Sequence, residues 1–158
     1  MDFPALRVRD LEGAEYLIPD ELPGGPHVIV LAFRQWHQAL VDQWKGPLET
    51  IAGRHPGTEV WEVPSLSRGY RLFRSSIDGG MRAGIPDPAV RRHTLTTYTD
   101  LDHLARDLEL PSLDTVYVFV VDCDGTIRWR GSDLPDAAAL AGLESALPAC
   151  GEDAGAGD

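Results

Sequence analysis

The stretch Val28-Ile29-Val30-Leu31-Ala32-Phe33 decides the fold. All six residues are apolar, so a strand here has no polar face and belongs in the centre of a sheet that is covered on both sides. Beyond it, apolar residues recur every three or four positions, which predicts a helix with one buried face. These residues are Trp36, Leu40, Val41, Trp44, Leu48 and Ile51. Because this spacing continues past Pro47, we expect the proline to kink the helix without ending it.

The segments before and after this strand and helix show the alternation of polar and apolar residues that is typical of strands. Residues 59–63 alternate in polarity and are bounded by Gly57 and Pro64. This pattern predicts a second strand after the helix. A strand, a helix and a second strand in this order predict a parallel pair with a right-handed crossover. Upstream, residues 6–9 and 15–18 are two short alternating stretches, which predict a small hairpin.

The second half of the chain is less regular at first. Glycines and prolines interrupt residues 65–96, so no long element is expected there. A helix is predicted over 98–108, with Thr97 or Thr99 as its cap.

Residues 116–121 form a second run that is apolar on both faces. The turn residues Asp122-Cys123-Asp124-Gly125 follow, and residues 126–130 return as an antiparallel strand. A last helix is predicted over 135–147. This order predicts an α/β fold with a mixed central sheet and helices on both faces, which is the thioredoxin-like arrangement. We expect one such domain over 1–150 and a disordered acidic tail over 151–158.

The composition excludes several classes of function. The chain has 158 residues, 14 basic and 25 acidic, with a net charge of −11, which argues against a nucleic-acid binder. Its apolar runs are far shorter than the ~20 residues of a membrane helix, and no signal peptide is visible at the start. Two cysteines are too few for a disulfide scaffold. We therefore expect a cytoplasmic protein with reduced thiols.

Several segments together resemble a known family. Arg71-Leu-Phe73, Met81-Arg-Ala-Gly-Ile-Pro86, Tyr117-Val-Phe-Val-Val-Asp122 and Gly125-Thr-Ile-Arg-Trp129 are similar to the family of the mitochondrial ATP synthase assembly factor number ten. The N-terminal part of the chain, around Leu11-Glu-Gly13 and Leu22-Pro-Gly24, resembles peroxiredoxin and thiol-disulfide oxidoreductase domains. The first resemblance implies a thioredoxin-fold assembly chaperone that is not a redox enzyme.

The residues for thiol chemistry are absent where this fold would need them. A reactive thiolate belongs at the start of the first long helix, where the helix dipole lowers its pKa. Here the sequence reads Arg34-Gln35-Trp36-His37. Leu113-Asp114-Thr115 stands where thioredoxins place a cis-proline. Cys123 lies between two aspartates, which disfavour a thiolate. We therefore predict no catalytic residue.

Two other groups of residues are candidate sites. Arg34 and His37, at the start of the long helix, could bind an anion. Residues 68–92 hold six arginines against two aspartates, a balance of +4, whereas the rest of the chain carries −15. Within this insert we predict that Arg82, Arg91 and Arg92 bind carboxylates of a protein partner. No motif for a metal or another cofactor is present.

Three functional hypotheses follow from the sequence. The first is a non-catalytic thioredoxin-fold protein that binds a protein partner, as a chaperone or assembly factor. The second is a peroxiredoxin-like or thiol-disulfide oxidoreductase, which would use Cys123 or a thiol of its partner. The third is a binder of a small molecule or anion at Arg34 and His37.

Overall fold

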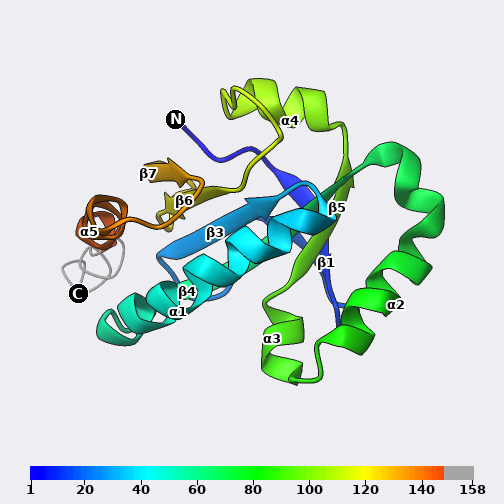
Figure 1. Cartoon of the computed structure of the whole chain (residues 1–158), viewed down its shortest axis with the longest axis horizontal. Helices are drawn as coiled ribbons and strands as arrows, with labels where there is room; N and C mark the ends of the chain where they lie inside the picture. Colours follow the sequence, from blue (N-terminus) through cyan, green and yellow to red (C-terminus); the bar gives the residue numbers. More distant parts are fainter. Residues whose placement is uncertain (148–158) are drawn as a thin grey trace.

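A mixed seven-stranded sheet forms the centre of the molecule (Figure 1), in a computed structural model that describes residues 1–147. The strand order is β2-β1-β5-β4-β3-β6-β7. The strands are β1 (Leu6–Asp10), β2 (Glu15–Ile18), β3 (His27–Ala32), β4 (Glu59–Ser67), β5 (Leu95–Thr99), β6 (Tyr117–Val121) and β7 (Ile127–Ser132). The tail expected over 151–158 lies outside the described residues.

The strand that decides the fold lies in the interior of the sheet, as predicted. β3 pairs with β4 in parallel and with β6 in antiparallel orientation. Every residue of β3 and β6 is buried. The N-terminal hairpin of β1 and β2 and the late hairpin of β6 and β7 are also confirmed. Apolar runs and alternation therefore identified these strands correctly.

Helices cover both faces of the sheet. Helix α1 (Gln38–Arg54) and helix α5 (Ala137–Ala146) pack on one face, where Trp44, Leu48 and Leu143 are buried against β3 and β6. Helix α4 (Leu101–Asp107) covers the other face together with the N-terminal segment. Helix α1 continues through Pro47, as its apolar spacing predicts. The predicted mixed sheet with helices on both faces is thus present.

The helix predicted over 98–108 is wrong at its start. Tyr98 and Thr99 belong to β5, which pairs with β4 in parallel, with Tyr98 opposite Leu66. Helix α4 begins only at Leu101 because the Asp100 side chain accepts a hydrogen bond from the backbone N–H of His103. Neither Thr97 nor Thr99 is therefore the cap.

The stretch that was expected to be broken contains more regular structure than predicted. After β4 come the 3₁₀ helix η2 (Arg68–Phe73), helix α2 (Arg74–Gly84) and helix α3 (Pro88–Arg92). Helix α2 includes Gly79 and Gly80, yet it runs for 11 residues beside the sheet, beyond β5 and β1 (Figure 1). None of its residues is buried.

The two outer strands differ from the central ones. β2 has only four residues. In β7 the exposed side chains of Arg128 and Arg130 alternate with half-buried residues, and the pairing with β6 shifts register between Val120 and Val121. The turn into β7 is held by the buried carboxylate of Asp122, which accepts hydrogen bonds from the backbone of Asp124 and Thr126.

Candidate functional site

The edge of the sheet where β3 and β4 end is the first candidate site. Because the two strands are parallel, their carboxyl ends meet at the same edge. After β3 the chain forms the 3₁₀ helix η1 (Gln35–His37) and enters α1. After β4 it forms η2. The predicted anion-binding residues Arg34 and His37 both lie at this edge.

His37 is fully buried and supports the turn between β3 and α1. Its Nδ1 accepts hydrogen bonds from the backbone N–H groups of Phe33, at 3.0 Å, and Arg34, at 3.2 Å. Burial lowers the pKa of His37, and the charge of Arg34 lowers it further, against an opposing effect of Asp114. The ring is therefore a neutral acceptor, and protonation would remove both hydrogen bonds.

Arg34 is half-exposed and already has an acidic partner. Its Nη2 lies 3.3 Å from Oδ1 of Asp114, in the segment before β6. The structure thus brings Arg34 and His37 together, but as one paired cation and one neutral ring. Anion binding by this pair stays a prediction.

Trp36 is exposed, although its spacing predicted a core position. It has 57% of its surface exposed, and the centre of its ring lies 4.3 Å from the centre of the His37 ring. The spacing misleads because Trp36 lies in η1, before α1 begins. Trp44, eight residues further on, is completely buried as predicted, and its Nε1 donates to the backbone oxygen of Asp133.

Further apolar side chains are exposed at the same edge. In η2, Leu72 is 92% exposed and Phe73 60%, and Tyr70 is also exposed. We call Trp36, Tyr70, Leu72 and Phe73 the apolar edge. Large apolar side chains that lie exposed at one edge of a sheet are candidates for a protein interaction site. Leu72 and Phe73 stand out in the sequence as two adjacent apolar residues of segment 71–73. Helical spacing could not predict that their side chains are exposed.

Most arginines of the insert are engaged within the molecule. Arg82 pairs with Glu12, at 3.1 Å. Arg91 donates to the backbone oxygens of Ile85 and Arg82 and so caps the carboxyl end of α2. Arg92 is exposed and forms no ion pair or hydrogen bond with another described side chain. Of the three predicted partner-binding arginines, Arg92 is thus the one whose charge is fully available.

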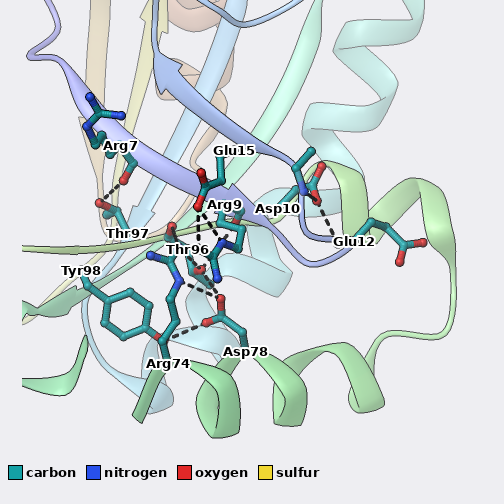
Figure 2. Close-up of polar contacts among 11 residues, drawn as sticks. Arg7, Arg9, Asp10, Glu12, Glu15, Arg74, Asp78, Thr96, Thr97 and Tyr98 are labelled. Carbon is teal, nitrogen blue, oxygen red and sulfur yellow. Dashed lines mark hydrogen bonds and ion pairs between the residues drawn. The ribbon is translucent and has the colours of Figure 1, made fainter. Parts of the chain in front are cut away.

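Asp78 is the centre of a polar cluster that holds α2 to the sheet (Figure 2). Its carboxylate accepts hydrogen bonds from the Tyr98 hydroxyl and the Thr96 hydroxyl, both at 2.8 Å. Arg74 pairs with it at 3.3 Å and lies over the Tyr98 ring. Burial and the hydrogen bond to Asp78 raise the pKa of Tyr98, so the phenol stays protonated. We call Arg74, Asp78, Thr96 and Tyr98 the Asp78 cluster.

Cys123 lies at the other edge of the sheet. β6 begins opposite Leu31 and ends opposite His27, so the turn after it is a strand length away from the start of α1. That length is roughly 15–20 Å. Cys123 is disulfide-bonded, so the expected reduced thiol is wrong for this residue. Cys150 lies outside the described residues.

The part of the chain that the structure describes contains neither a metal site nor a membrane-spanning helix. Within residues 1–147, no three His, Cys, Asp or Glu side chains form a group that could hold a metal ion. None of the helices described there is long and apolar enough to cross a membrane.

Comparison with known proteins identifies the fold. Neither a protein-family model nor a curated protein matches the sequence. Among solved structures, copper-bound ScoI of Arabidopsis thaliana has a TM-score of 0.61 at 10% identity, over 92% of this chain and 98% of that one. BsSco, of the Sco family of cytochrome c oxidase assembly proteins, has 0.60 at 10% identity, over 92% of each. The exposed lipoprotein thioredoxin Etrx1 of Streptococcus pneumoniae has 0.55 at 13% identity, over 90% and 98%. The chain therefore has a thioredoxin-like fold, as its sequence predicts.

Proposed function

We propose that this protein binds a protein partner through the apolar edge and performs no thiol chemistry of its own. The observation that carries the proposal is the exposure of Trp36, Leu72 and Phe73 where β3 and β4 end. A thioredoxin-like enzyme would hold its nucleophile at this edge, at the start of α1. Here an exposed indole and a buried neutral histidine occupy that place. An apolar surface in place of a thiol favours binding over catalysis.

The partner we propose is a subunit or protein under assembly. The resemblance to the assembly factor family supports this, and BsSco belongs to a family of cytochrome c oxidase assembly proteins. Arg92 and Arg82 lie toward the start of β5, a strand length away from η2, and would add attraction to carboxylates of the partner at a distance from the apolar contact. Replacing Arg92 with glutamate should slow association with the partner and make the association rate depend less on salt concentration. Arg91 is unsuitable for this test because it caps α2.

The test is affinity capture with matched surface variants. Leu72→Asp/Phe73→Asp adds two carboxylates to the apolar edge, and Ala138→Asp/Ala141→Asp adds two to the exposed side of α5. We expect the wild type and the α5 variant to retain the same partner and the edge variant to lose it. Equal capture by all three proteins would show that the apolar edge is not the docking surface.

The second candidate is a thiol-disulfide oxidoreductase, which the disulfide at Cys123 and the likeness to a thioredoxin favour. It would require a site at the edge opposite the start of α1. An insulin-reduction and a peroxide assay with the wild type and Cys123→Ser/Cys150→Ser separate the two functions. We expect no thiol-dependent turnover and unchanged partner capture. Turnover that the double substitution abolishes would favour the enzyme, and with it a compartment that is not reducing.

A further inference from the structure

Three loops meet at the edge of the sheet where β3 ends. They are residues 33–37 after β3, residues 111–116 before β6 and residues 133–136 after β7. The register of the sheet brings them together, because Tyr117, the first residue of β6, pairs with Leu31 of β3 and with Ser132, the last residue of β7. We call these three loops the loop surface.

Polar contacts join the three loops to one another and to α1. The Arg34 guanidinium lies 3.3 Å from Oδ1 of Asp114. The next residue, Thr115, donates its hydroxyl to Oδ1 of Asp133 at 2.6 Å. The backbone oxygen of Asp133 in turn accepts the hydrogen bond from the buried Trp44 ring at 2.8 Å. The loops are therefore held in one arrangement and present one surface to a partner.

The loop surface exposes two large apolar side chains. Trp36 belongs to the loop after β3, and Leu134, which is 58% exposed, belongs to the loop after β7. Burying a large apolar side chain is favourable in proportion to the area removed from water. A partner that covers both side chains would therefore gain free energy from apolar contact at this part of the apolar edge and beside it.

The charge of the loop surface is acidic. The three loops contain Asp114, Asp133 and Asp136 against a single basic residue, Arg34, which is a balance of −2. Asp133 and Asp136 form no ion pair with any residue of the described chain, and the Asp114 side chain is 75% exposed. Outside residues 68–92 the whole chain carries −15, so its field adds to this local charge. Such a surface attracts basic groups of a partner and repels acidic ones.

We propose that the loop surface binds a basic amphipathic segment of the protein partner, with apolar side chains against Trp36 and Leu134 and lysine or arginine side chains toward Asp133 and Asp136. This inference rests on the proposed function, because it names the chemistry of the partner at the same edge. A cation of the segment can also lie over the exposed indole of Trp36. Arg34 competes with such cations because it already pairs with Asp114.

The test compares three synthetic amphipathic peptides with leucine at the same positions. The remaining positions hold lysine in the first, glutamate in the second and equal numbers of both in the third. Isothermal titration calorimetry should give the lysine peptide a dissociation constant at least about tenfold lower than that of the glutamate peptide, with the mixed peptide between them. Its binding should weaken when NaCl is raised from about 50 mM to about 500 mM. In ¹H–¹⁵N spectra, the amides that shift should lie in the three loops.

Two variants with effects of opposite sign show that the charge, and not a change of structure, decides binding. Asp133→Asn keeps the size of the side chain and should weaken binding of the lysine peptide about two- to fivefold, the range for exposed ion pairs. Asp124→Asn is the matched control, because Asp124 is exposed in the turn after β6 at the other edge, and it should change nothing. Arg34→Gln removes the competing cation and should strengthen binding, which a damaged surface could not do.

Equal affinity for the three peptides, or tightest binding of the glutamate peptide, would overturn this inference. The same holds if no peptide binds at millimolar concentration, if the shifted amides lie elsewhere, or if Asp133→Asn and Asp124→Asn have the same effect. The proposed function is decided separately, by capture of the partner with Leu72→Asp/Phe73→Asp. Loss of the partner in that variant, together with no preference among the peptides, would refute only the basic character of the segment.

Discussion

Helices α1 and α2 illustrate two ways of holding a helix to the same sheet. In α1, Val41, Trp44, Leu48 and Ile51 are buried, so the helix is held by the removal of apolar surface from water. In α2 no residue is buried, and the helix is held through Asp78 by hydrogen bonds. Each such hydrogen bond contributes only about 1 kcal/mol net. We therefore expect α2 to open locally at a lower free energy than α1.

The largest effect should come from the buried face of α1. Trp44→Ala removes a fully buried ring and should lower the free energy of unfolding by about 3–5 kcal/mol. Trp36→Ala, at an exposed site in η1, should change it by less than about 1 kcal/mol. Urea denaturation of both variants measures the difference. Similar losses would mean that Trp36 is packed and not available to a partner.

The next largest effect should come from the Asp78 cluster. Asp78→Ala leaves the Tyr98 hydroxyl without its acceptor and removes the nearer of two acceptors of the Thr96 hydroxyl, so it should cost about 1–3 kcal/mol. Hydrogen exchange should show the loss of protection mainly in the amides of α2, while those of α1 keep theirs. Ser76→Ala, on the exposed side of the same helix, is the control. A uniform loss of protection in both helices would contradict the local anchoring of α2.

The glycines of α2 should give a smaller effect of opposite sign. A Cβ at Gly79 or Gly80 would meet no atom within 4 Å. Gly79→Ala and Gly80→Ala should therefore each stabilise the protein by about 0.5–1 kcal/mol. In α5, a Cβ at Gly142 would lie 2.8 Å from Nε1 of Trp129, so Gly142→Ala should not stabilise it. Thermal unfolding of the three variants tests this contrast.

The smallest effect should follow a change of pH from 7.5 to 6.5. Burial lowers the pKa of His27 and His37 in the folded protein. The unfolded chain then binds more protons, so stability falls as the pH falls below the ordinary histidine range. At pH 6.5 only about half of an unperturbed histidine is protonated, which keeps the change small. His27→Gln should reduce the fall in the urea midpoint, and an unchanged fall would exclude His27 as a source.

The same contrast explains what the sequence could predict of the fold. The doubly apolar strands and α1 were found because burial leaves a regular spacing of apolar residues. Strand β5 was missed because Thr96 and Thr97 are polar yet buried. Their hydroxyls bond the backbone oxygens of Arg9 and Arg7, which are distant in the sequence. The spacing of residues within one segment carries no information about such partners.

The candidate site was predictable only in part. The absence of a cysteine at the start of α1 was readable from the sequence because the preceding strand was located correctly. The exposure of Leu72 and Phe73 was not, since they lie in a 3₁₀ helix within the stretch that was expected to be irregular. Arg91 was predicted as a docking residue from its charge, and that role stays a prediction; its cap on α2 could not be predicted because α3 brings it beside the carbonyls of Ile85 and Arg82.

The two outer strands have a consequence for how molecules of this protein meet one another. An exposed, long and flat edge strand can pair with a second copy and continue the sheet, which leads to aggregation. β2 is too short to offer such a template. β7 carries two exposed arginines, and the bulge in its partner pairing disturbs its regularity. Both ends of the sheet therefore resist strand exchange between molecules, which leaves contacts between side chains as the route to association.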